Sequence, residues 1–236
     1  MSGNYKEIYV QSIKDKENFW KKISDDIFWY SKPTKILNTD NPPFYKWFED
    51  GVTNTCYNAL DFHVDKGRGE KIAIIYDSPI TNTQKKITYN ELKNQVALFA
   101  GALKKQGATK GDRVIIYMPM IPEAVIAMLA CGRIGAVHSV VFGGFAANEL
   151  ASRIDDSKAK LIVSASCGYE PGRTVEYKPL LNKALELSKH KPNKCIIYQR
   201  EKFKSELNNS TDISWEDSLK DVQPAECEKM KGSDYA

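Results

Sequence analysis

Short apolar runs alternate with helix-length segments through the middle of the chain. The runs at 114–117, 137–141 and 161–165 are rich in Val, Ile and Leu, which favours strands buried on both faces. The interval 122–133 is an apolar segment of helix length, and a second helical interval begins near Ala146. This βαβαβ order predicts an α/β fold with a parallel or mixed sheet and helices on both faces.

The segment before this unit has a clear helix start. Two strands are expected at 70–78 and 84–89, joined by the turn-rich residues 79–82. Thr88, followed three residues later by Glu91, predicts a capping box at the start of a helix. The apolar positions of this helix recur at helical spacing, and Gly107 is placed to end it: Leu92, Val96, Phe99 and Leu103.

Residues 1–65 differ in composition from the rest and predict an amino-terminal arm ahead of an α/β subdomain at 66–236. Nine aromatic residues crowd one interval of this arm: Phe19, Trp20, Phe28, Trp29, Tyr30, Phe44, Tyr45, Trp47 and Phe48. They have no regular period, so we expect packing side chains and short helices near 15–24 and 55–65. A base-stacking platform would need interleaved basic residues, and the local charges are mixed.

After the third apolar run, an amphipathic helix is expected at about 175–189, with five apolar positions facing inward: Val175, Leu180, Leu181, Ala184 and Leu185. Another strand is expected at 195–198. The sequence then becomes polar, and Trp215 is expected as a lone apolar anchor without a terminal helix.

Charge and composition favour a globular protein with a small-molecule ligand. The 34 basic and 30 acidic residues are interspersed and give a formal charge of +4, so neither nucleic acid nor a membrane surface is expected as a partner. Prolines, Glu123 and Arg133 interrupt the apolar stretch 114–145, so no membrane span is expected. The amino terminus lacks an apolar signal region, and we expect a cytoplasmic location.

Cysteine and histidine patterns indicate no metal centre. The five cysteines include no C-x-x-C pair, so neither a zinc site nor a disulfide framework is indicated, and reduced thiols are expected. His138 falls within a strand and is expected to be a hydrogen-bonded core residue. Arg133 is expected to bond the last carbonyls of its helix and to interact with the helix dipole.

Two loops should meet at the carboxyl edge of the sheet, where ligands bind in such folds. In the loop 142–145, Gly143 and Gly144 would let a ligand approach the backbone before a helix amino terminus, although a tight turn explains them equally well. In the loop 168–173, a Pro-Gly turn presents Glu170 and Arg173, and Arg173 is either a phosphate ligand or an ordinary surface residue. Neither G-x-G-x-x-G nor the Walker-type G-x-x-x-x-G-K-[ST] occurs.

Two long stretches resemble one enzyme family. YMPMIPEAVIAMLACGRIGAVHSVVFGGFAANELASRIDDSKAKLIVSA (117–165) is similar to the short-chain acyl-CoA synthetases, the acetyl- and propionyl-CoA synthetases of the adenylate-forming superfamily. KWFEDGVTNTCYNALDFHV (46–64) resembles their amino-terminal region. The resemblance implies activation of a short-chain carboxylate with ATP and Mg²⁺ to an acyl-adenylate, followed by transfer of the acyl group to coenzyme A.

The same resemblance implies a binding site but no catalytic residues in this chain. Gly144 and the segment Glu170, Pro171, Gly172 and Arg173 match the family's contacts to the nucleotide end of coenzyme A. Acetyl-CoA synthetases typically have Arg at the position of Glu170, and the form EPGR followed by VEYKPLL looks more like the propionyl-CoA branch. The resemblance implies that the ATP loop, the Mg²⁺ site and the catalytic lid lie in a carboxyl-terminal portion beyond this chain. The 236-residue chain alone is therefore expected to be inactive.

Two other functions stay open at this point. A stand-alone, non-catalytic module that binds coenzyme A or regulates another protein would share the same loops. A nicotinamide-dependent enzyme would also use a parallel sheet, but the missing dinucleotide fingerprint counts against it. The coding sequence beyond residue 236 would distinguish an enzyme fragment from a stand-alone module.

Overall fold

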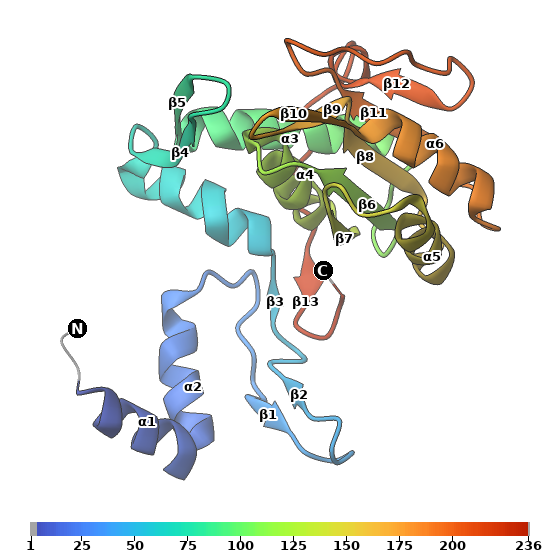
Figure 1. The fold of residues 1–236 in the computed structure, drawn as a ribbon. Coiled ribbons are helices and arrows are strands. Elements are labelled where there is room, and N and C mark those ends of the chain that lie inside the picture. The colour runs from blue at the N-terminus through green and yellow to red at the C-terminus, as the bar shows by residue number, and fades with distance from the viewer. Residues whose placement is uncertain (1–3, 236) are drawn as a thin grey trace. The chain divides into compact units, whose positions relative to one another are not determined.

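The computed structural model describes residues 4–235, which divide into two compact units (Figure 1). The first unit comprises the chain up to Asn54 together with Lys229–Asp234, and the second comprises Thr55–Glu228 with Tyr235. The chain therefore passes from the first unit into the second and back again.

The first unit combines short helices with small two-stranded sheets. Its helices are α1 (Tyr5–Lys14), α2 (Lys16–Ile23) and the 3₁₀ turn η1 (Ser24–Asp26). Its strands are β1 (Leu37–Asn38), paired antiparallel with β2 (Lys46–Trp47), and β3 (Val52–Thr53), paired antiparallel with β13 (Met230–Lys231). The helix expected near 15–24 is present, and α1 precedes it as an element that the sequence pattern did not indicate.

Aromatic side chains of the first unit pack mainly on one another. The ring of Trp29 lies 5.7 Å from that of Phe48, and the ring of Trp20 lies 6.1 Å from that of Trp47. A Cβ on Gly51 would lie 2.6 Å from the Trp29 ring, so only glycine fits at this contact. The aromatic composition of the arm is therefore explained by packing.

The second unit is built on a five-stranded parallel sheet with the strand order β12-β11-β8-β6-β7. The strands, in chain order, are β6 (Arg113–Met118), β7 (Val137–Phe142), β8 (Leu161–Ala165), β11 (Lys194–Tyr198) and β12 (Asp212–Ser214). All residues of β8 are buried, as are most of those of β6, because both faces of these strands are covered. The predicted fold class is confirmed.

Helices cover both faces of the sheet, and the strand order explains which face each one takes. They are α3 (Tyr89–Lys105), α4 (Pro122–Arg133), α5 (Ala147–Ser157), α6 (Tyr177–Leu187) and the short α7 (Trp215–Ser218). The chain steps from β6 to β7 in one direction and from β7 to β8 in the other. Right-handed crossovers then put α4 and α5 on opposite faces; α3 packs against α4 and α6 against α5 (Figure 1).

Two hairpins flank this sheet. One consists of β4 (Ile72–Ser78) and β5 (Thr83–Thr88), and it leads directly into α3. The capping box predicted there is present: Thr88 accepts from the backbone N–H of Glu91, and the Glu91 carboxylate accepts from the N–H of Thr88 at 2.8 Å. The π-helical turns η2 (Tyr57–Asp61) and η3 (Val64–Arg68) fill the interval where a short helix was expected.

The second hairpin corrects the sequence-based prediction for residues 168–176. These residues form β9 (Cys167–Glu170) and β10 (Arg173–Glu176), joined by a turn at Pro171-Gly172. Val175 therefore lies in a strand opposite Gly168, and α6 begins two residues later than its pattern suggested. The strand pairing uses backbone groups that would otherwise start the helix.

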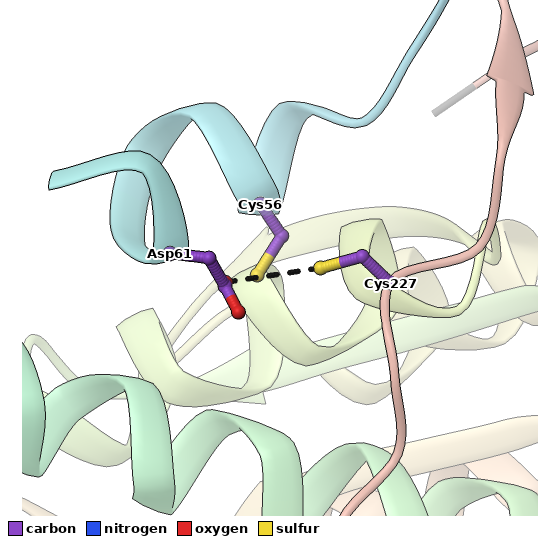
Figure 2. Close-up of side chains that lie close together, drawn as sticks. All are labelled: Cys56, Asp61 and Cys227. Atoms are coloured by element: carbon purple, nitrogen blue, oxygen red, sulfur yellow. Dashed lines mark hydrogen bonds between the residues drawn. The ribbon is translucent and has the colours of Figure 1, made fainter. Parts of the chain in front are cut away.

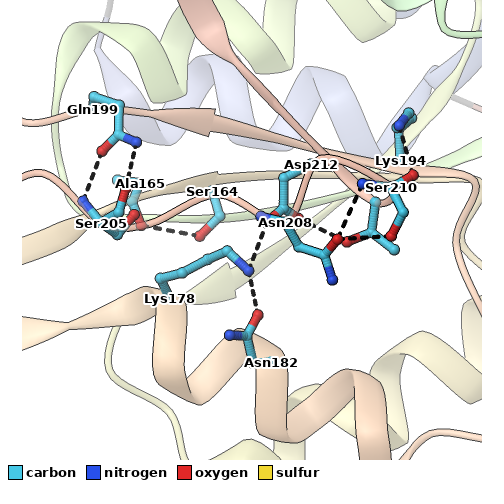
Figure 3. Close-up of polar contacts among 11 residues, drawn as sticks. Ser164, Ala165, Lys178, Asn182, Lys194, Gln199, Ser205, Asn208, Ser210 and Asp212 are labelled. Atoms are coloured by element: carbon cyan, nitrogen blue, oxygen red, sulfur yellow. Dashed lines mark hydrogen bonds and ion pairs between the residues drawn. The ribbon is translucent and has the colours of Figure 1, made fainter.

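A buried ion pair joins α6 to β12 (Figure 3). The Lys178 ammonium lies 2.8 Å from the Asp212 carboxylate and also contacts the side-chain oxygen of Asn182, and both charged side chains are almost fully buried. The Asp212 carboxylate also accepts from the backbone N–H of Asn208 at 2.7 Å. This network attaches the outermost strand and the loop before it to the body of the unit.

Arg133 and Trp215 have larger roles than expected. The Arg133 side chain is buried and makes two hydrogen bonds to the Asp61 carboxylate, at 2.7 and 3.0 Å, and a third to the Ala225 carbonyl at 2.6 Å. It therefore links three segments of the second unit. Trp215 stacks on Phe99 with a centroid separation of 3.7 Å, so this anchor packs on α3.

Candidate functional site

The two loops named in the sequence lie at the carboxyl ends of β7 and β8. Phe142, Gly143, Gly144 and Phe145 follow β7, and Pro171 and Gly172 form the tip of the β9–β10 hairpin, which continues from β8. Gly144 (φ 94°) and Gly172 (φ 76°) both have left-handed backbone conformations, which glycine adopts without strain. A Cβ at either position would meet nothing within 4 Å, so both turns present open backbone.

Tyr177, at the start of α6, lies between these loops. A Cβ on Gly143 would lie 2.1 Å from the Tyr177 hydroxyl oxygen, and one on Gly168 would lie 2.7 Å from it. Both positions therefore need glycine because the phenol occupies the space between them. Gly143 is therefore explained by the close approach of a protein side chain, whereas Gly144 is explained by its left-handed backbone conformation.

A second tyrosine, Tyr117, supports the loop at 142–145. Tyr117, near the end of β6, donates its hydroxyl hydrogen to the Phe145 carbonyl at 3.0 Å, and its ring lies 5.0 Å from that of Tyr177. Burial, followed by the nearby Tyr117 and Glu170, raises the pKa of Tyr177 to about 12, and burial also raises the pKa of Tyr117. Both phenols therefore stay protonated at neutral pH; Tyr117 supports the loop through its hydrogen bond, and Tyr177 through packing.

Glu170 and Arg173 form an exposed ion pair across the hairpin turn. The Glu170 carboxylate oxygen Oε2 accepts from Arg173 Nε at 2.7 Å and lies 2.7 Å from Nη2. The Arg173 side chain is 71% exposed, so its guanidinium keeps solvent-facing donors. An anion at this turn would meet one arginine that is already partly neutralised.

A hollow of about 410 Å³ lies beside these loops and has a mixed lining. Apolar atoms come from Met118, Ile121 and Phe142, while Glu170 and Arg200 add charge. Its volume is within the range typical of small-ligand sites. A neighbouring hollow of about 210 Å³ shares Tyr76, Ile121, Tyr169 and Arg200 with it.

Arg200 and Tyr177 are site residues that the sequence analysis missed. Arg200 is only 9% exposed, and its guanidinium carbon lies 4.8 Å from the centre of the Tyr169 ring. It follows β11 by two residues, so the rule that ligands bind at the carboxyl edge could have identified it. No sequence signal indicates Tyr177, because its role depends on two glycines in separate loops.

His138 does not join this site, and one expectation about it is wrong. It lies in β7 and is half-buried, but its Nδ1 is buried without a hydrogen-bond partner among residues 4–235. Burial lowers the pKa of this imidazole below its usual 6.5. The ring is therefore a neutral packing residue.

Comparison with known families identifies the fold and its family. A family model described as AMP-binding enzyme matches residues 62–236, and one described as acetyl-coenzyme A synthetase N-terminus matches residues 5–59. The chain belongs to the AMP-binding enzymes. It is the amino-terminal part of an acetyl-CoA synthetase-like AMP-binding enzyme, in the short-chain acyl-CoA synthetase family, so the resemblance seen in the sequence is confirmed.

Several relatives of this AMP-binding enzyme share about half of its residues. Acyl-CoA synthetase short-chain family member 3, mitochondrial, from Rattus norvegicus is 51% identical over 95% of this chain and 33% of the relative. Acetyl-coenzyme A synthetase from Streptomyces avermitilis is 48% identical over 76% of this chain and 27% of the relative. The chain thus spans about a third of the length of the curated relatives it matches.

A solved structure supports the fold alone. Acetoacetyl-CoA synthetase from Streptomyces lividans superposes with a TM-score of 0.85 and covers 98% of this chain and 35% of its own, with 22% identity. In the part of this AMP-binding enzyme that the structure describes, every helix is too short or too polar to cross a membrane.

Proposed function

We propose that this chain belongs to a ligase that activates a short-chain carboxylate with ATP to an acyl-adenylate and transfers the acyl group to coenzyme A. The observation that carries the proposal is the pair of open glycine turns at the carboxyl edge of the sheet, with Arg173 beside them. Membership in the short-chain acyl-CoA synthetase family supports this reaction class. The division into an arm at 1–65 and an α/β subdomain at 66–236 is part of the same proposal.

Within this proposal, the chain contributes to binding coenzyme A. Gly144 and Gly172 fit a phosphorylated nucleotide because their open backbone lets phosphate oxygens approach N–H groups. Arg173 would donate charge-assisted hydrogen bonds to a phosphate, and Glu170 and Pro171 would hold the turn that positions it. We assign ATP, Mg²⁺ and the catalytic groups to a carboxyl-terminal portion. We therefore propose no catalytic residue within this chain.

We propose propionate rather than acetate as the carboxylate. The support is the EPGR segment, which is similar to the propionyl-CoA branch in having Glu170 where the acetate branch has arginine. The partners are then coenzyme A, the carboxylate and the remaining part of the same enzyme. A cytoplasmic location stays a prediction; the names of several relatives place those proteins in mitochondria.

Two measurements test this function. Pure 236-residue chain should bind coenzyme A in calorimetry more tightly than pantetheine, which lacks the nucleotide phosphates. It should show no acid-dependent exchange between ATP and pyrophosphate with propionate or acetate, because we place the groups that stabilise the phosphoryl transition state elsewhere. Exchange by the pure chain, or equal affinity for pantetheine, would contradict the proposal.

A further inference from the structure

Two cysteine thiols from opposite ends of the second unit meet beside the carboxylate of Asp61 (Figure 2). Cys56 directly precedes η2, and Cys227 belongs to the segment that follows α7. Their sulfur atoms and a carboxylate oxygen of Asp61 all lie within 4.8 Å of one another. Cys56 is fully buried, whereas Cys227 is partly exposed.

Neighbouring charges make these thiols unequal. Arg133 Nη1 lies 2.7 Å from Asp61 Oδ2 and 3.7 Å from Cys56 Sγ, and the Cys227 thiol donates to Asp61 Oδ2 at 3.8 Å. The Cys227 thiol and the Arg133 guanidinium lower the pKa of Cys56 despite its burial. Hydrogen bonding to Cys56 and burial raise the pKa of Cys227. Cys56 is therefore the more readily ionised of the two thiols.

A metal ion suits this cluster less well than oxidation does. Two sulfur atoms and a carboxylate are ligands for zinc or a similar soft cation. However, the Arg133 guanidinium already binds both oxygens of Asp61, at 2.7 and 3.0 Å, and also contacts Cys56. A cation bound to the same three ligand atoms would face an arginine that is buried with them.

We propose that Cys56 and Cys227 are a redox-sensitive pair that hydrogen peroxide converts to a disulfide. In the first step the Cys56 thiolate attacks one peroxide oxygen, the O–O bond breaks, hydroxide leaves, and the sulfur becomes a sulfenic acid. In the second step Cys227 attacks the Cys56 sulfur, the S–S bond forms, and the sulfenic oxygen leaves as water after taking up the Cys227 proton. The hydroxide takes up the proton that Cys56 lost on ionising, so two thiols are oxidised and one peroxide is reduced to two waters.

The proposal requires the segment that carries Cys227 to open and admit the oxidant. Residues 221–229 form neither helix nor strand. Within this segment the Ala225 N–H bonds the Ala97 carbonyl of α3, the Glu228 N–H bonds the Arg133 carbonyl of α4, and the Ala225 carbonyl accepts from the Arg133 side chain at 2.6 Å. Local opening of a segment with few such bonds costs less than global unfolding, and it would expose Cys56.

The disulfide would join the two ends of the second unit. Cys56 lies two residues after Asn54, the last residue of the first stretch assigned to the other unit, and Cys227 lies two residues before Lys229, where that unit resumes. Oxidation would thus tie together the two stretches that lead out of the α/β unit. Because the closed loop would contain nearly the whole unit, the disulfide should oppose its unfolding.

The test is thiol counting on the intact 236-residue chain. Chelator-treated, reduced protein should show five thiols when denatured, and limited peroxide should lower this to three, with dithiothreitol restoring all five. A tryptic map should contain a peptide pair cross-linked through Cys56 and Cys227. Oxidised protein should also unfold at a higher urea concentration than reduced protein.

Matched variants distinguish the pair from general oxidation. Cys227→Ser should stop disulfide formation and leave Cys56 as a sulfenic acid that dimedone labels. Cys131→Ser should still lose two thiols, because burial raises the pKa of Cys131 to about 12 and leaves it unreactive. Five thiols persisting in the folded wild-type chain, or a disulfide between other cysteines, would overturn the proposal. The proposal would also be overturned if one equivalent of zinc stayed bound through the chelator treatment and protected both thiols from peroxide.

Discussion

Glu170 and Arg173 form an ion pair across the turn of the β9–β10 hairpin, and the Glu170 carboxylate reduces the positive charge available to an anion there. Their side chains are 46% and 71% exposed, so the ion pair itself adds little stability. In the proposed site its larger effect would be on binding, because the carboxylate would compete with a phosphate for the same guanidinium donors. The pair therefore allows the roles of the two residues to be separated by substitution.

In the complete ligase, Arg173→Ala should raise the KM for coenzyme A about 10- to 100-fold, because a hydrogen bond to a charged group is worth about 1.5–3 kcal/mol. Adenylation should hardly change. The control is Arg153→Ala, which removes an exposed arginine from α5. An unchanged KM in the Arg173 variant would remove the phosphate contact that we propose.

Glu170→Gln should leave the KM for coenzyme A unchanged or lower it, because the substitution releases Arg173 from a carboxylate 2.7 Å away while keeping a side chain of the same size. Steady-state kinetics with varied coenzyme A and saturating ATP and carboxylate measure this effect. A markedly higher KM would mean that the carboxylate contacts the cofactor directly.

His138 should make the chain less stable at acidic pH. Burial lowers the pKa of its imidazole below 6.5 in the folded state, so below that pH the unfolded chain binds a proton that the folded chain does not. Stability is therefore lost as the pH falls from about 7 towards the folded-state pKa. Urea midpoints measured from pH 7 to about pH 5 should fall less in His138→Gln than in wild type. Parallel curves would contradict this assignment.

At the scale of elements, the helices and strands with a regular apolar pattern are the ones that the sequence could predict. The β6–α4–β7–α5–β8 order, the buried α4 and the capping box at Thr88 follow from local periodicity and spacing, and the structure contains them. For the β9–β10 hairpin the sequence pattern predicts a loop and the start of a helix instead. A two-residue turn beside a helix start leaves little periodic signal.

Contacts between distant segments could not be predicted. Tyr177 fills space between Gly143 and Gly168, and Cys56 meets Cys227 because the segments at either end of their unit both contact helices α3 and α4. For the proposed site, the sequence named the glycine turns and Arg173 but missed Arg200 and Tyr177. Residues that act across a fold carry no spacing pattern from which to infer them.

The buried ion pair between η2 and α4 should contribute far more to stability than exposed pairs do. Asp61→Asn leaves Arg133, whose side chain is 2% exposed, as an uncompensated buried charge, so the free energy of unfolding should fall by about 3–5 kcal/mol. Urea unfolding measures this loss.

The matched control is Glu186→Gln, which breaks an exposed pair with Lys183 and should hardly change the unfolding free energy. Adding Arg133→Met to Asp61→Asn should recover part of the loss, because the buried charge is then removed as well. A small effect of Asp61→Asn alone would show that Arg133 is satisfied by its backbone contacts.

At the scale of the whole molecule, exposed apolar side chains gather around the hollow in the second unit. Met120 is 88% exposed, Phe142 69% and Val140 52%, and all three line that hollow. Contiguous apolar surface of this kind marks sites that bind a partner or another part of the chain. The proposed carboxyl-terminal portion of the enzyme is a suitable occupant.

The 236-residue chain should therefore bind a hydrophobic dye and self-associate. Combining Met120→Lys with Phe142→Lys should weaken both effects without lowering stability, because the side chains are already in water. Dye fluorescence and sedimentation measure the two effects. Strong dye binding that persists in the double variant would place the exposed apolar surface elsewhere, for example at Trp20 and Trp47 of the first unit, which are 39% and 37% exposed.

The stack of Trp215 on Phe99 has an optical consequence. Of the four tryptophans, Trp215 alone belongs to the second unit, and the other three, at positions 20, 29 and 47, belong to the first. Replacing those three with phenylalanine would leave one fluorophore, 7% exposed and tied to the sheet's covering helix. Its emission would report on the α/β unit alone, and comparison with the unaltered chain, whose emission includes the other three tryptophans, would show whether the two units unfold together or separately.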